Sequence, residues 1–101
     1  MLFLLVTGQA EEIAKIRIYK GGAITWNHEK LELREADVRL KKLKSAQGTV
    51  WYYREDARGE PHPNAMKLKK LVMENRLPLS FSTEPDFSTV VLPDGSVKPR
   101  E

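Results

Sequence analysis

The stretch TVWYYR, residues 49–54, decides the fold of this chain. Successive side chains of an extended strand point to opposite faces of a sheet, so Val50 and Tyr52 share one face while Trp51 and Tyr53 share the other. Both faces of this strand are thus apolar or aromatic. In a two-layer fold, helices cover one face of the sheet. We expect the other face to be covered by a tail, a loop or another subunit.

The residues before this strand predict two paired strands, a short third strand and a helix. Apolar and polar side chains alternate in residues 16–20 and 23–27, and Gly21-Gly22 between them allows the positive φ values of a tight turn. Residues 31–33 resume the alternation. In the range 34–44 apolar side chains recur every three or four residues, which predicts an amphipathic helix.

The residues after the strand predict a second helix at 64–75, a closing strand at 79–83 and one more strand at 89–92. Pro63 suits the first turn of that helix, and Pro78 ends it. The resulting fold class is α+β: a small two-layer domain with two helices packed on one face of a mixed four- to five-stranded sheet.

We divide the chain into a single α+β domain at residues 16–92, an N-terminal strand or signal remnant at 1–15, and a C-terminal turn and tail at 93–101. The apolar run at 2–6 is too short for a membrane span, which needs about 20 apolar residues, and no other segment is longer. It is read as a strand, with the remnant of a signal peptide as the alternative.

Composition narrows the function classes. The 101 residues suffice for one domain, and 31% of them are charged, as in soluble globular proteins. There is no cysteine, which excludes disulfides, thiolate zinc sites and cysteine nucleophiles. The formal charge of +3 is a mild bias, whereas dedicated nucleic-acid binders usually carry a larger and more segregated excess.

No recognisable reaction centre appears, so we expect a protein that is not an enzyme and needs no cofactor or metal. The densest group of reactive side chains is the loop with Glu55, Asp56, Glu60 and His62. A metal or acid–base site needs about three such groups to converge. A small hydrolase or metal-dependent enzyme that uses this loop is therefore the alternative to a solvated loop.

The aromatic strand suggests two further uses. Trp51 or Tyr52 with Arg54 resembles the stacking surfaces of single-strand binders, but the glycine-aromatic signature of that sheet type is missing, so nucleic acid is a minor alternative. Met66 and Met73, seven residues apart, form a small stripe on the second helix. Methionine is common at adaptable contact surfaces.

Our preferred interpretation makes these side chains a protein-contact surface. The candidate interaction residues are Trp51, Tyr52, Tyr53, Met66 and Met73. We expect a homodimer, formed through the exposed sheet face or an edge strand.

Two runs of sequence carry a family resemblance. IRIYKGGAITWNHEKLELREADVRLKKL, residues 16–43, resembles the start of the soluble periplasmic domain of the ExbD/TolR biopolymer-transport family. That domain reads as a strand, a glycine turn, a strand ending near Asn, a short apolar piece and a helix with spaced leucines. The corresponding positions here are Gly22, Ile24, Asn27, Leu31, Leu33, Leu40 and Leu43. The run GTVWYYREDARGEPHPNAMKLKKLVMENRLPLSFSTEPDF, residues 48–87, is similar to the strand, acidic loop, helix and closing strand that follow.

The resemblance implies a place in the cell envelope. Members of that family are non-enzymatic partners of a membrane motor, and their soluble domains dimerise and contact other envelope proteins. The family's functional aspartate lies in an N-terminal transmembrane helix that has no counterpart here, so no proton-carrying residue is assigned. We expect a self-associating, non-enzymatic interaction module of the bacterial envelope or periplasm, with an envelope protein as a further partner and no small-molecule substrate.

Overall fold

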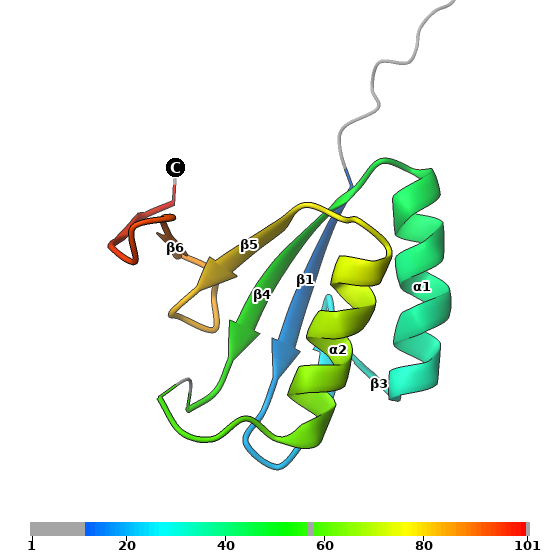
Figure 1. Ribbon diagram of the computed structural model, residues 1–101, viewed down its shortest axis with the longest axis horizontal. Coiled ribbons are helices and arrows are strands. Elements are labelled where there is room, and N and C mark those ends of the chain that lie inside the picture. The colour runs from blue at the N-terminus through cyan, green and yellow to red at the C-terminus, as the bar shows by residue number, and fades with distance from the viewer. Residues whose placement is uncertain (1–11, 57, 101) are drawn as a thin grey trace, which may run out of the picture.

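The computed structural model describes residues 12–56 and 58–100 and shows two helices packed on one face of a mixed sheet (Figure 1). The predicted α+β class is confirmed. The helices are α1 (Leu33–Ser45) and α2 (Pro63–Glu74). The strands are β1 (Ile13–Ile18), β2 (Ile24–Trp26), β3 (Glu29–Leu31), β4 (Thr49–Arg54), β5 (Leu79–Ser82), β6 (Thr89–Val91) and β7 (Val97–Pro99).

The larger sheet has five strands in the order β3-β2-β1-β4-β5. β1 pairs antiparallel with β2 and parallel with β4, and β5 pairs parallel with β4. The two parallel pairs follow from the helices, because a strand can return in the same direction only after a long crossover connection. α1 makes the crossover from the β1–β3 hairpins to β4, and α2 makes the one from β4 to β5. As a result β4 lies inside the sheet and β5 lies at its edge.

Left-handed backbone conformations make the two hairpin turns tight. Gly22 has a φ of +96° between β1 and β2, while Asn27 and His28 have φ of +49° and +80° between β2 and β3. Two consecutive positive φ values are the signature of the turns that match the twist of a hairpin. Asn27 also accepts a hydrogen bond from the Lys15 amide through its side-chain oxygen, 2.8 Å away.

The core lies between the sheet and the helices. It combines one face of β1, β2 and β4 with the predicted apolar stripes of both helices. Its fully buried aliphatic members are Ile16, Ile18, Ile24, Leu40, Val50, Leu68 and Val72. The side chains of β4 alternate as predicted: Val50 and Tyr52 are buried under the helices, and Trp51 and Tyr53 are half-buried on the opposite face.

The chain's own C-terminal segment covers much of that opposite face. Phe87 is only 2% exposed, and its ring centroid lies 6.2 Å from that of Trp51. Arg100 places its guanidinium 3.9 Å from the Trp51 ring centroid. The same guanidinium donates hydrogen bonds to the carbonyl oxygens of Phe87 and Thr89 and to the Ser80 hydroxyl. From the sequence we expect a tail, a loop or another subunit to cover this second sheet face, and the C-terminal tail contributes to that cover through Arg100.

Both ends of the domain differ from the expected boundaries. β1 begins at Ile13, inside the segment separated as 1–15, because residues 13–15 continue the ladder with β4. Residues 1–11 of that segment, including the apolar run, lie outside the described residues. The predicted strand at 89–92 is present as β6, but the turn and tail at 93–101 include β7, which pairs with β6 in a separate two-stranded sheet. In the described part of the chain, neither helix is long and apolar enough to cross a membrane.

Candidate functional site

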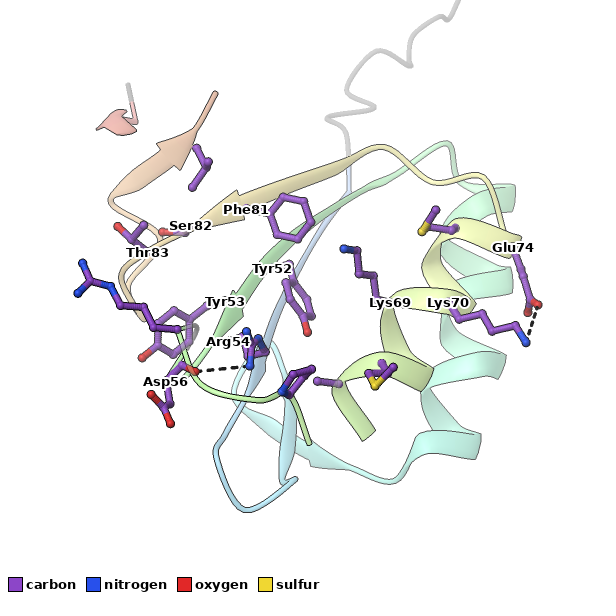
Figure 2. A pocket seen from close by; sticks show the side chains of 16 residues that line it. Tyr52, Tyr53, Arg54, Asp56, Lys69, Lys70, Glu74, Phe81, Ser82 and Thr83 are labelled. Atoms are coloured by element: carbon purple, nitrogen blue, oxygen red, sulfur yellow. Dashed lines mark hydrogen bonds and ion pairs between the residues drawn. The ribbon is translucent and has the colours of Figure 1, made fainter. Parts of the chain in front are cut away.

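A groove of about 1240 Å³ lies beside α2, over the last two strands of the five-stranded sheet (Figure 2). We call it the α2–β5 groove. It is lined by side chains from β4, the loop after β4, α2, β5 and β6. Its residues are Tyr52, Tyr53, Arg54, Asp56, Arg58, Pro61, Ala65, Met66, Lys69, Lys70, Met73, Glu74, Phe81, Ser82, Thr83 and Val91.

The groove exists because two helices cannot cover five strands. Neighbouring strands are about 4.8 Å apart, whereas packed helices are about 8–10 Å apart, so two helices cover roughly four strands. In the view of Figure 1, α2 lies to the right of β1, with α1 beyond it, while β4 and β5 lie to the left of β1 and β5 is the farthest of the three from the helices. The helix-side face of β5 therefore has no helix above it among the described residues.

The floor of the groove is aromatic. Tyr52 and Phe81 are direct neighbours across the β4–β5 ladder, and their rings meet edge to face with centroids 5.6 Å apart. Figure 2 shows both rings on the helix side of the sheet. Ala65, a small residue in the first turn of α2, lines the groove next to this pair. Phe81, the half-buried member of this pair, can thus contribute the apolar contacts that aromatic side chains supply at interfaces.

Two exposed methionines form the α2 side of the groove. Met66 is 61% exposed and Met73 is 63% exposed, although both are large apolar side chains. Their seven-residue separation is two helical turns, so they lie on the same side of α2. A flexible, polarisable side chain adapts to partners of different shape.

Positive charge surrounds this apolar surface. Lys69 and Lys70 project from α2, and Arg54 and Arg58 lie at the end near the β4–α2 loop. The Lys69 ammonium lies 5.4 Å from the Phe81 ring centroid, a cation–π contact. The groove therefore combines an apolar floor with a cationic margin.

The two carboxylates that line the groove already contact cations. Asp56 lies 3.9 Å from the Lys20 ammonium, and Glu74 lies 4.0 Å from that of Lys70. The groove lining contains four cationic side chains and these two carboxylates, so its net charge is positive.

The structure brings together four of the five candidate interaction residues. Tyr52, Met66 and Met73 line the groove on the helix side of the sheet, and Tyr53 also borders it, although its side chain points to the opposite face of β4. Trp51 lies on the opposite face of the sheet, under Arg100. Sequence reasoning missed Lys69 and Phe81 as members of this surface. The alternation in residues 79–83 indicated a half-buried Phe81, but nothing in it indicated that β5 would lie outside the helices.

Two residues of the loop proposed for a catalytic alternative make structural hydrogen bonds. The Glu55 carboxylate accepts a hydrogen bond from the Lys20 amide, 2.8 Å away. His62 caps α2, because its Nδ1 accepts the Asn64 amide hydrogen at 3.0 Å. Within residues 12–56 and 58–100, no three histidine, cysteine, aspartate or glutamate side chains gather closely enough to hold a metal ion. Glu55 and His62 thus contribute to the contacts that position this loop and the start of α2.

The aromatic residues of the nucleic-acid alternative do not form one stacking surface. Trp51 and Tyr52 point to opposite faces of β4. The Trp51 ring is already in contact with Arg100, and the Lys15 ammonium lies 5.4 Å from it. Tyr52 is only 5% exposed. Bases stack on exposed aromatic faces, so this arrangement gives no support to single-strand binding.

Burial of Tyr52 predicts a loss of stability in alkali. Desolvation raises the pKa of its hydroxyl, with Arg54 opposing the shift. On raising the pH, the tyrosine of the unfolded chain loses its proton first, so stability is lost above about pH 10. Urea unfolding at pH 8 and pH 11 measures this loss. Tyr52→Phe should lose less stability between these pH values than the parent chain, and an equal loss in both would contradict the assignment.

Comparison with known proteins identifies no relative. No family model matches the chain. No curated protein and no solved structure matches it either. The resemblance to the ExbD/TolR domains thus stays a prediction from the sequence, and the site must be interpreted from its own geometry.

Proposed function

We propose that this protein is a non-enzymatic interaction module that binds another polypeptide in the α2–β5 groove. The observation that carries the proposal is the pairing of Met66 and Met73, both more than half exposed, with an aromatic floor and a cationic margin. Contiguous exposed apolar surface on a small soluble domain is typical of an interaction site.

The size of the groove favours a polypeptide over a small molecule. Pockets for small ligands usually enclose about 300–1,000 Å³ and bury most of the ligand. The α2–β5 groove is larger, about 1240 Å³, and has an open side formed by exposed side chains of α2. A peptide segment can fill such a groove along its length, whereas a metabolite would leave much of it in contact with water.

Self-association and an envelope location belong to the same proposal. The predicted homodimer would form through the exposed sheet face or an edge strand, and β5 is one such edge strand. The envelope location and a partner in the membrane motor rest on the sequence resemblance to the ExbD/TolR soluble domains. The contacts of Glu55 and His62, which stabilise the fold, favour this class of function over the hydrolase alternative.

Site-specific photocrosslinking in the native cell tests the proposal. Benzoylphenylalanine placed at Met73 or Met66 should form a covalent adduct with a polypeptide, because both side chains line the groove. Val38 is the matched control: it is an apolar α1 residue, 57% exposed, and does not line the groove. The chain has a mass of 11.6 kDa. An adduct of twice this mass would identify a homodimer, and an adduct of any other mass would identify a different partner.

The control position decides the interpretation of these adducts. Adducts at positions 66 and 73 and none at position 38 would support groove binding. Absence of adducts at both methionines, or the same adducts at Val38, would contradict it. Sedimentation of the purified chain over a range of concentrations then tests the dimer itself, which a strict monomer at high concentration would rule out.

A further inference from the structure

We infer that the occupant of the α2–β5 groove is an acidic amphipathic helix, which lies alongside α2 and over β5. The inference rests on the proposed function, because it specifies the chemistry of the polypeptide that the groove receives. Three independent features of the described residues support it: the open place in the helix layer, the spacing of side chains along α2, and the excess of positive charge.

The helix layer has a place for one more helix. α1 and α2 lie side by side on the sheet, and β5 extends beyond them with Phe81 facing the same side (Figures 1 and 2). A sheet face in a two-layer domain is normally covered by helices. A third helix next to α2 would complete that layer and cover the half-buried Phe81.

The α2 side of the groove has the spacing of a helix-packing surface. Met66, Lys70 and Met73 recur at intervals of four and three residues, and Lys69 lies next to them. Rows at these intervals form the ridges that fit between the side chains of a neighbouring helix. An extended peptide added to β5 would instead bond to the strand's backbone and would have less contact with a stripe two turns long.

The charges select an acidic occupant. Lys69 and Lys70 lie on the α2 side, and Arg58 lies at the loop end of the groove. The nearby carboxylates of Asp56 and Glu74 are already close to the lysines at 20 and 70. Glutamates on the flanks of an apolar helical stripe would meet these cations, while lysines there would be repelled.

Synthetic helices of known design test the inference by fluorescence anisotropy. The probe is a labelled 21-residue peptide with leucines at helical spacing on one face and glutamates on both flanks. Its first control replaces the glutamates with lysines, and its second places two prolines in the middle, which breaks the helix. We expect the acidic helix to bind, and each control to bind at least about tenfold more weakly.

A matched pair of variants locates the binding. Lys69→Glu and Lys67→Glu make the same charge change on the same helix, but only Lys69 lines the groove. We expect Lys69→Glu to weaken binding of the acidic helix about tenfold and Lys67→Glu to change it less than about threefold. Met73→Glu should weaken it at least as much as Lys69→Glu, with Val38→Glu as its control. Circular dichroism of each variant shows whether it is folded.

The outcomes separate this inference from the proposed function. Equal binding of the proline peptide would identify an extended occupant, and equal binding of the lysine peptide would remove the acidic preference; either overturns the inference. If no peptide binds at millimolar concentration although photocrosslinking at Met73 yields an adduct, the inference fails and the proposed function stands. If both experiments are negative, both fail.

Discussion

Replacement of Phe87 with alanine is expected to lower the free energy of unfolding by about 3–5 kcal/mol, the usual cost of removing a buried phenylalanine ring. Phe87 is 2% exposed, and its ring lies against Trp51 and 4.8 Å from the Arg17 guanidinium. Without the ring, Trp51 loses a neighbour on the sheet face opposite α1 and α2. Urea unfolding followed by circular dichroism measures the effect.

An exposed apolar residue gives the control for this substitution. Val38→Ala removes apolar side-chain atoms from α1, but Val38 is 57% exposed, so the free energy of unfolding should change by no more than about 0.5 kcal/mol. A loss below about 1 kcal/mol in Phe87→Ala would show that the C-terminal segment contributes little to the fold. The description of this segment as the cover of the second sheet face would then be wrong.

Replacement of Gly22 with alanine is expected to lower the free energy of unfolding by about 2–4 kcal/mol, because it combines backbone strain with loss of a helix cap. Gly22 has a φ of +96°, which alanine adopts only with strain. An added Cβ would also lie 2.6 Å from the His62 ring, too close for both to keep their places. His62 caps α2, and Asn64 donates a hydrogen bond to the Gly22 carbonyl, so the turn and the start of α2 support each other.

The neighbouring glycine is the control. A Cβ added at Gly21 would meet nothing within 4 Å, so Gly21→Ala should change the free energy of unfolding by less than about 1 kcal/mol. Thermal unfolding of the two variants side by side gives the comparison. Similar midpoints for the two would contradict the close contact between Gly22 and His62.

Local sequence patterns predicted those parts of the fold that depend on local rules. The alternation in residues 49–54 correctly placed Tyr52 and Trp51 on opposite faces, since side-chain direction in a strand follows directly from position. The dipeptide His62-Pro63 lies at the start of α2, where proline is favoured. The sequence did not show that His62 would be the cap, since a histidine beside acidic residues also fits a catalytic site.

The candidate site could be predicted only in part, because it depends on how distant elements are placed. Met66 and Met73 were recognised from their spacing, but Phe81 joins them only because β5 lies beyond α2. In the same way, Arg100 reaches Trp51 across 49 residues of chain, and no local pattern indicates such a contact. The local alternation of side chains predicts that a strand face is buried, but it does not predict which distant segment covers that face.

The position of β4 between β1 and β5 has a consequence for protein synthesis. As the chain emerges from the ribosome, β1 and α1 appear first, yet the parallel neighbour of β1 is β4, and that of β4 is β5. The nascent chain therefore cannot complete its sheet until residues 79–82 have left the exit tunnel. Until then β4 has one unpaired edge, and an unpaired strand edge in an incompletely folded chain favours aggregation.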